Sequence, residues 1–203
     1  MNQPLKPIRL TNRDLEILDT LGTHRFLSTS QLTTLFFPSR ATAERRLRKL
    51  ADHKLVRRIF APVSGSQHTQ SIYTLAHAGA KQVAMHFGIP KPLYLPEHKT
   101  RKAWFLDHTL RRNDLWIGLK TLDRERLSFD LQSWEHAKPR VQINTAIQPR
   151  RGVLKPITLV PDASVVLRHH HRSESFAVEV DMGTVSTRPV SYTHLTLPTT
   201  YTV

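Results

Sequence analysis

The sequence predicts an α+β protein: an N-terminal winged helix-turn-helix, followed by an α/β domain with a long helix and a small mixed sheet. Three observations lead to this prediction. A basic amphipathic helix is expected over residues 39–54, two strands separated by turn-forming residues follow it, and three prolines interrupt residues 88–99. Helices joined by a tight turn form a helix-turn-helix. The expected parts are an arm over 1–10, the winged helix over 11–87, a linker over 88–99, the α/β domain over 100–189 and a tail over 190–203.

The first two helices have clear start or stop signals. Thr11 is a suitable N-cap and Asp14 follows three residues later, which makes an Asp version of the capping box. We expect this helix to end at Gly22, since glycine is favoured just after a helix. A second helix is expected over residues 30–37 and stops at Pro38.

The basic helix is central to the prediction. Ala43, Leu47, Leu50 and Ala51 recur at helical spacing and form one apolar stripe, and Ser39 is well placed as N-cap. Most of the arginines and lysines lie outside this stripe. A short basic helix with small residues in its first turn is suited to the major groove of DNA. A charged helix that only faces solvent is the alternative interpretation.

A hairpin is expected directly after the basic helix. Residues 55–60 and 71–75 have strand composition, and Pro62 and Gly65 between them favour a turn. In this position a hairpin is the wing of a winged helix, and its tip commonly reaches the DNA backbone or minor groove. A fourth helix over 76–87 is expected to pack on the others or on a second subunit.

The second half begins with a long helix over residues 100–122, in which the motif HTLRRND contains His108 and Asn113. We interpret both as polar residues of the helix surface that meet a loop. The elements expected after it are a strand over 127–135, a basic, turn-rich insert over 136–156, and strands over 157–167 and 175–181. The polar link between the last two strands contains His169, His170 and His171. We interpret it as a solvated loop rather than a metal site, since neighbouring residues of an extended segment point in different directions.

The charge balance favours a nucleic-acid partner. The 203-residue chain has 30 Lys and Arg against 16 Asp and Glu, a formal net charge of +14, and enough hydrophobic residues, 39%, for a real core. The absence of cysteine excludes disulfides and thiolate metal sites and fits a reducing cytoplasm. No apolar run approaches the roughly 20 residues of a membrane span, and no secretory signal opens the chain. We therefore expect a soluble, cytoplasmic protein.

Several blocks of sequence together resemble one family. They are LTNRDLEILDTLGTHRFLSTSQLTTLFF, the basic helix, YTLAHAGA, HTLRRND, a strand ending in WE, PDASVVL and FAVEVDMGT. In this order, over about residues 8–185, they resemble the replication-relaxation proteins of plasmids and mobile elements. The resemblance implies an N-terminal winged helix that binds DNA and a C-terminal α/β domain. It also implies a setting in the replication, mobilisation or regulation of a plasmid, phage or integrative element.

The C-terminal half also resembles the core of PD-(D/E)xK nucleases, which makes the expected domain an incomplete, restriction-endonuclease-like one. The candidate catalytic residues are Glu135, Asp162, Glu179 and Asp181, of which Asp162 and Glu179 are the candidate ligands of Mg²⁺. Asp181 occupies the position of the lysine that such nucleases use. Because this cation is missing, we favour a degenerate structural or binding domain over an active nuclease.

DNA-binding residues are predicted on the basic helix and the hairpin. The full set is Ser39, Arg40, Thr42, Arg45, Arg46, Arg48, Lys49, Arg57, Arg58, Gln67 and His68. We expect a non-enzymatic protein without cofactors that binds double-stranded DNA sequence-specifically and forms a homodimer, since operator sites are usually read by dimers. Two alternatives stay open: a metal-dependent nuclease or nickase that uses Asp162 and Glu179, and an adaptor for a relaxase or replication initiator.

The last stretch, residues 190–203, does not continue the family pattern. Its sequence VSYTHLTLPTTYTV resembles the translation of a sequencing-library adapter. We therefore expect a non-native tail and a reading frame that is truncated near Pro189. A short polar tail with β propensity is the alternative.

Overall fold

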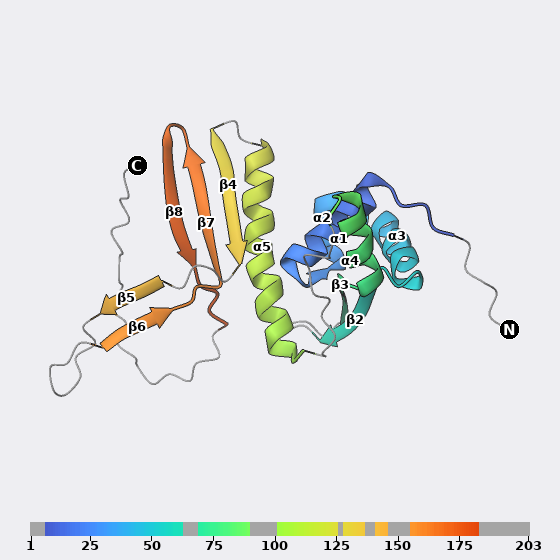
Figure 1. The fold of residues 1–203 in the computed structure, drawn as a ribbon, viewed down its shortest axis with the longest axis horizontal. Coiled ribbons are helices and arrows are strands. Elements are labelled where there is room, and N and C mark those ends of the chain that lie inside the picture. Colours follow the sequence, from blue (N-terminus) through green and yellow to red (C-terminus); the bar gives the residue numbers. More distant parts are fainter. Residues whose placement is uncertain are drawn as a thin grey trace. The chain divides into compact units, whose positions relative to one another are not determined.

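The computed structural model describes residues 7–62, 69–89, 101–125, 128–136, 141–145 and 155–182. The chain forms two compact units, an N-terminal unit of residues 1–117 and a C-terminal unit of residues 118–203. The described residues contain five helices and eight strands, which confirms the α+β class (Figure 1). Among these helices none combines the length and the apolar character needed to cross a membrane.

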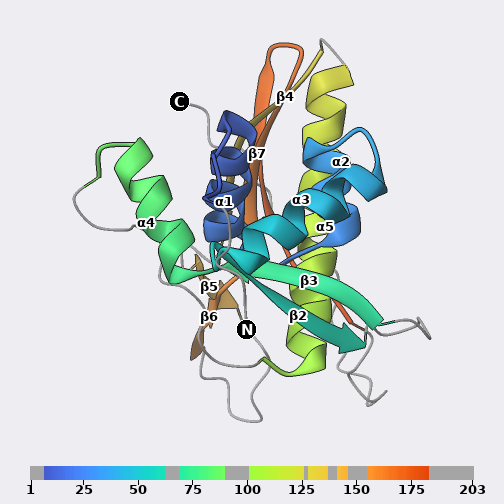
Figure 2. The same cartoon turned by 90° about the vertical axis from the view of Figure 1, so that its right-hand side faces the viewer.

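The N-terminal unit alternates helices with short strands. A three-stranded antiparallel sheet has the order β1-β3-β2, and α3 leads directly into β2, beside which it lies (Figure 2). The elements in chain order are α1 (Asn12–His24), β1 (Leu27–Ser28), α2 (Thr29–Phe36), α3 (Arg40–Asp52), β2 (Val56–Pro62), β3 (Thr69–Leu75) and α4 (His77–His86).

The start of α1 confirms the predicted capping box. The Asp14 N–H donates to Thr11 Oγ1 at 3.3 Å, and the Thr11 N–H donates to Asp14 Oδ2 at 2.7 Å. The predicted end at Gly22 is wrong, because the helix continues to His24 and ends where Arg25 takes a φ of +68°. The Arg25 N–H still donates to the carbonyl of Leu21, so it closes the last turn.

A short strand that was not predicted, β1, leads into a second capping box at the start of α2. β1 has only two residues, too few to show an alternating pattern, and its last residue, Ser28, is also the N-cap of α2. Ser28 Oγ accepts from the Gln31 N–H at 3.1 Å, and Gln31 Oε1 accepts from the Ser28 N–H at 3.0 Å. The helix therefore begins at Thr29, one residue earlier than predicted.

The basic helix forms as predicted. Ser39 is the N-cap of α3 and its hydroxyl accepts from the Thr42 N–H at 3.4 Å. Ala43, Leu47 and Leu50 are fully buried, so the apolar stripe faces the core of the N-terminal unit. The β2–β3 hairpin that follows is paired in register from Val56↔Leu75 to Pro62↔Thr69, and residues 63–68 between the strands lie outside the described part.

The first half of α5 (Ala103–Glu125) belongs to the N-terminal unit. Leu106 and Leu110 pack in one core cluster with Phe26 and Ile72. Asn113 is fully buried, so its expected exposure on the helix surface is wrong, but the expected contact with a loop forms; His108 of the same motif is half-buried. Of the segment 88–99, predicted to be a linker, only residues 88 and 89 are described, so the domain boundaries stay a prediction.

Buried polar side chains fasten α5 to the rest of this unit. Asn113 Nδ2 donates to the carbonyls of Phe26 at 2.7 Å and His24 at 3.2 Å, where the chain passes from α1 to β1. Gln31 of α2 donates through Nε2 to the Leu110 carbonyl at 2.8 Å and to Asp114 Oδ1 at 2.7 Å. Partners more than 70 residues apart in the chain satisfy these bonds.

The C-terminal unit contains a three-stranded sheet of order β4-β7-β8 and a separate β5–β6 hairpin (Figure 1). The strands are β4 (Phe129–His136), β5 (Val141–Thr145), β6 (Lys155–Leu159), β7 (Ala163–His169) and β8 (Arg172–Val178). Every described pair is antiparallel, so the predicted mixed sheet is wrong. For β7 and β8 the reason is their connection, which is too short for a parallel crossover.

Two predicted boundaries in this unit are also wrong. β5 forms inside the expected basic insert, and the strand expected over residues 157–167 is split into β6 and β7. The three histidines lie at the tight β7–β8 turn, in which His169 pairs with Arg172 and His170 has a φ of +53°. Within the described ranges no group of three His, Cys, Asp or Glu residues is placed to hold a metal ion.

Candidate nucleic-acid interface

The side of α3 opposite its buried stripe carries the predicted DNA-binding residues. Ser39, Arg40, Arg45, Arg48 and Lys49 are exposed, and Thr42 is half-buried. The cause is the helical repeat, which places Leu47 and Leu50 on the core side and the intervening cations on the other. Four cations therefore share one solvent-facing side of α3.

Two of these positions have local partners that an incoming ligand can replace. Arg40 Nε lies 2.8 Å from Glu44 Oε1 one turn later, and the two side chains are 71% and 47% exposed. An exposed pair at this spacing contributes only about 0.3–0.5 kcal/mol. The hydroxyls of Ser39 and Thr42 lie 3.0 Å apart and cap the first turn. Both contacts are weak, so the Arg40 guanidinium and the two hydroxyls can exchange them for contacts with DNA.

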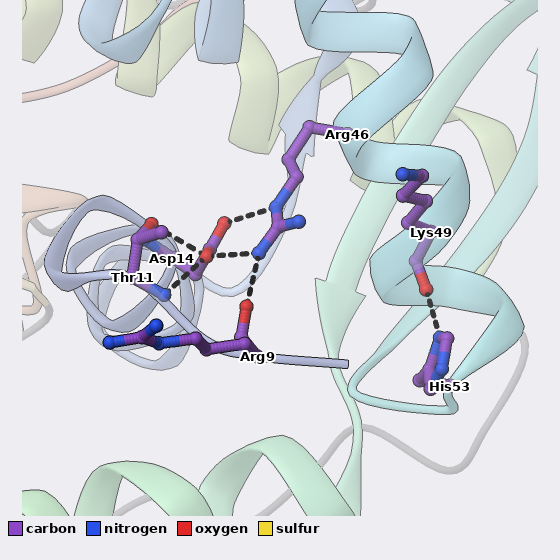
Figure 3. Close-up of polar contacts among 6 residues, drawn as sticks. All are labelled: Arg9, Thr11, Asp14, Arg46, Lys49 and His53. Carbon is purple, nitrogen blue, oxygen red and sulfur yellow. Dashed lines mark hydrogen bonds and ion pairs between the residues drawn. The ribbon is translucent and has the colours of Figure 1, made fainter. Parts of the chain in front are cut away.

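The last turn of α3 is held by a ring nitrogen. His53 Nδ1 lies 2.8 Å from the carbonyl oxygen of Lys49, while the Lys49 side chain extends from the helix surface (Figure 3). The next residue, Lys54, has a φ of +57°, which turns the chain from the helix into β2. The cation of Lys49 is thus presented on an ordered helix end.

Arg46 differs from the other arginines of α3 because it points toward α1. Its Nε donates to Asp14 Oδ1 at 2.7 Å, and its Nη2 donates to Asp14 Oδ2 and, at 3.0 Å, to the carbonyl of Arg9 (Figure 3). The Asp14 side chain is fully buried and that of Arg46 is 20% exposed. Its guanidinium is engaged inside the protein rather than presented with the other cations.

The pKa values of this pair reflect the contact. Burial raises the pKa of Asp14, but hydrogen bonds from Arg46 and Thr11 outweigh it, and the net pKa lies below its ordinary value. The hydrogen bond to Asp14 in turn raises the pKa of Arg46. The pair is therefore ionised at neutral pH and joins the start of α1 to the middle of α3.

The hairpin presents an arginine and an aromatic ring on one face. Arg58 donates to Ser71 Oγ through Nε at 3.1 Å and Nη2 at 2.8 Å, and its guanidinium lies 4.4 Å from the centre of the Phe60 ring. Phe60 is 63% exposed and was not among the predicted residues. Arg57 is half-buried and, as the neighbouring strand residue, lies on the opposite face. Gln67 and His68 are outside the described residues.

A family model described as replication-relaxation matches residues 18–196, most of the chain. The chain belongs to the replication-relaxation family. This membership indicates a role in the replication or mobilisation of plasmids or other mobile elements. No curated protein and no solved structure matches the chain. The family match includes part of residues 190–203, which the structure does not describe, so the origin of that segment stays a prediction.

The candidate nuclease carboxylates of this replication-relaxation protein lie at one end of the β4-β7-β8 sheet. Glu135 is the second-last residue of β4, Asp162 precedes β7 and Glu179 follows β8. The register pairs Ala163 with both His136 and Val178, which brings the three backbone positions to the same end. As noted above, these side chains do not gather into a three-residue metal group among the described residues.

Asp162 has a structural partner at this position. Its Oδ2 accepts from the Val180 N–H at 2.9 Å, and its own N–H donates to the Val178 carbonyl at 2.9 Å. These bonds fasten the chain after β8 to the start of β7. Asp181 follows in that same segment and is exposed.

Two exposed arginines beside α3 were not among the predicted DNA-binding residues. Arg9 is bound through its carbonyl to Arg46, and the guanidinium of Arg13 lies 4.7 Å from the centre of the Phe37 ring, just before α3. Both side chains are exposed. Their spacing of four residues near a helix start was a signal, but only tertiary contacts place them next to α3.

Proposed function

We propose that this replication-relaxation protein binds double-stranded DNA sequence-specifically, with the N-terminal unit acting as a winged helix. The observation that carries the proposal is the division of α3 into a fully buried apolar side and an exposed basic side. The element order, helix-strand-helix-helix-hairpin, supports it. The setting is the replication, mobilisation or transcriptional control of a mobile element.

The roles within this interface follow from exposure. Residues of the first turn, Ser39, Arg40 and Thr42, read base edges together with Arg45, while Arg48 and Lys49 bind phosphates. Arg58 of the hairpin binds the backbone or minor groove, and Arg57, Gln67 and His68 stay predictions for the same part. Arg46 is left out, because its guanidinium holds Asp14. Binding as a homodimer to a two-fold site completes the proposal.

The first test is binding of the full chain to a labelled duplex of random sequence across a salt series. We expect affinity to fall steeply with salt, since each neutralised phosphate releases counterions. The variant Arg45→Ala should weaken binding by about 1–3 kcal/mol on a selected site. Glu44→Gln, which removes a charge from the same helix side, is the control and should bind at least as well. Weak binding with little salt dependence would contradict the proposal and favour the adaptor for a relaxase or initiator.

A supercoiled-plasmid assay with Mg²⁺ or Mn²⁺ tests the nuclease alternative. We expect the plasmid to stay intact, because Asp181 occupies the lysine position and Asp162 binds the Val180 N–H. Metal-dependent nicking that disappears in Glu179→Gln would overturn this expectation. Glu179 is the better variant for the test, since replacing Asp162 also removes a backbone contact.

A further inference from the structure

We propose that the start of α1 is a second DNA-binding element, in which Arg9 and Arg13 bind phosphates on the strand beside the groove that α3 enters. The inference rests on the proposed DNA binding and extends it to residues outside the helix-turn-helix and its hairpin. We call Arg9 and Arg13 the α1 arginine pair. The role of Arg46 changes accordingly, from a base-contacting residue to a positioning residue.

The first contact fixes Arg9. Arg46 Nη2 donates to the Arg9 carbonyl at 3.0 Å while the same guanidinium binds both oxygens of Asp14. Thr11 binds that carboxylate through its N–H at 2.7 Å and its hydroxyl at 2.6 Å. The backbone from Arg9 to Asp14 is therefore tied to the middle of α3, and the Arg9 side chain extends away from Arg46 (Figure 3).

The second contact holds Arg13 close to the start of α3. Its guanidinium lies over the ring of Phe37, 4.7 Å from the ring centre. Phe37 is the C-cap of α2 and comes two residues before Ser39, the N-cap of α3. A cation over an aromatic face is held in orientation by a weak attraction and keeps its N–H donors available. Arg13 is therefore presented beside the first turn of α3.

The chemistry of the pair suits phosphate rather than base recognition. Both arginines are exposed and always charged, and guanidinium binds phosphate oxygens through two parallel N–H donors. Arg13 lies on α1 and Arg9 just before it, not on α3, so they flank the groove instead of entering it. Contacts of this kind fix the register of a protein on the duplex and contribute affinity without selecting sequence.

The test compares two arginines of the pair with a matched arginine of the same helix. Arg25 follows the other end of α1, is exposed, and has its guanidinium 5.5 Å from the centre of the Phe105 ring, as Arg13 has beside Phe37. The proteins are the full chain and its variants Arg9→Gln, Arg13→Gln and Arg25→Gln. Binding to a labelled random-sequence duplex is measured across a salt series, and circular dichroism checks the fold.

The expected result is a change in slope. Arg9→Gln and Arg13→Gln should each reduce the slope of log affinity against log salt by about 0.9, the value for one phosphate contact to B-DNA. Arg25→Gln should keep the slope of the unmodified protein. Slopes equal to that of the unmodified protein in both pair variants, with a reduced slope in Arg48→Gln, would refute the pair and leave the proposed function standing. Absence of salt-dependent binding in the unmodified protein would refute both.

A double-mutant cycle tests the positioning role of Arg46. Arg46→Lys keeps a cation but lacks the planar fork that binds Asp14 and the Arg9 carbonyl together. If Arg46 positions Arg9, the slope change caused by Arg9→Gln should shrink in the Arg46→Lys background. Additive changes would show that Arg46 does not act through Arg9. Should Arg46→Lys fail to fold, the comparison of Arg9, Arg13 and Arg25 decides alone.

Discussion

Arg46 of α3 holds the fully buried carboxylate of Asp14, 32 residues earlier in the chain, through two of its nitrogens. The carboxylate also accepts hydrogen bonds from the Thr11 N–H and hydroxyl, so one side chain caps the start of α1 and joins α1 to α3. A buried charge is tolerated when it is paired and fully hydrogen-bonded. This ion pair therefore couples the start of α1 to the orientation of the basic helix.

Removing the charge of Asp14 should destabilise the protein. Asp14→Asn leaves Arg46 without its anion inside the protein, and we expect the free energy of unfolding to fall by about 3 kcal/mol. Urea denaturation at neutral pH followed by circular dichroism measures the change. Glu44→Gln breaks the exposed pair with Arg40 and is the matched control, for which less than about 1 kcal/mol is expected. Equal effects of the two substitutions would contradict the structure.

The same pair predicts a loss of stability in acid. The pKa of Asp14 is lower in the folded protein than in the unfolded chain, so its contribution is fully present above about pH 4. It is lost as the pH falls through the folded-state pKa, because protonation then favours the unfolded state. The difference in unfolding free energy between the unmodified protein and Asp14→Asn should therefore shrink as the pH falls below about 4. A difference that stays constant with pH would show that folding does not lower the pKa of Asp14.

Two helical glycines should respond to alanine in opposite directions. A Cβ on Gly79 of α4 would lie 2.2 Å from the Leu55 carbonyl oxygen, so Gly79→Ala should cost about 1–3 kcal/mol. A Cβ on Gly118 of α5 would meet nothing within 4 Å, and Gly118→Ala should stabilise by about 0.5–1 kcal/mol through helix propensity. Thermal denaturation of the two variants measures both signs. A stabilising Gly79→Ala would mean that α4 does not pack closely on the Leu55 backbone.

Asn113 should matter for folding rather than for DNA contact. Asn113→Ala leaves the buried carbonyls of His24 and Phe26 without this donor, and a loss of about 2–3 kcal/mol is expected. Leu115→Ala is the control on the same helix, since Leu115 is 44% exposed. Denaturant titration of both variants makes the comparison, and an Asn113→Ala variant as stable as the control would contradict the assignment.

The packing of α5 also predicts which N-terminal fragment of the chain is the more stable. A fragment ending at residue 99 lacks the partners of Gln31, Phe26 and His24, whereas a fragment ending at residue 125 keeps them. We expect the longer fragment to unfold at the higher temperature. Identical melting temperatures would show that the N-terminal unit does not depend on α5.

The sequence by itself determined the local structure of this protein. Thr11 and Asp14, like Ser39 and Thr42, are joined within one helical turn, so a short window contains both partners of each cap. The stripe of Ala43, Leu47 and Leu50 likewise needs only the helical repeat to identify the buried side of α3. The family and the α+β class could be predicted because they depend on the order of such local signals.

The tertiary structure decided which polar residues face inward. Arg46 lies at the edge of the buried stripe of α3 and Arg45 does not, but only the fold brings Arg46 to a buried carboxylate 32 residues away. Asn113 lies at helical spacing from the buried Leu110 and Ile117, but only the fold brings it to its partners 87 and 89 residues earlier. β5 and the antiparallel β4-β7-β8 sheet depend on pairing between separate strands. Contacts of this range leave no periodic trace in one sequence, because each partner appears only once the chain has folded.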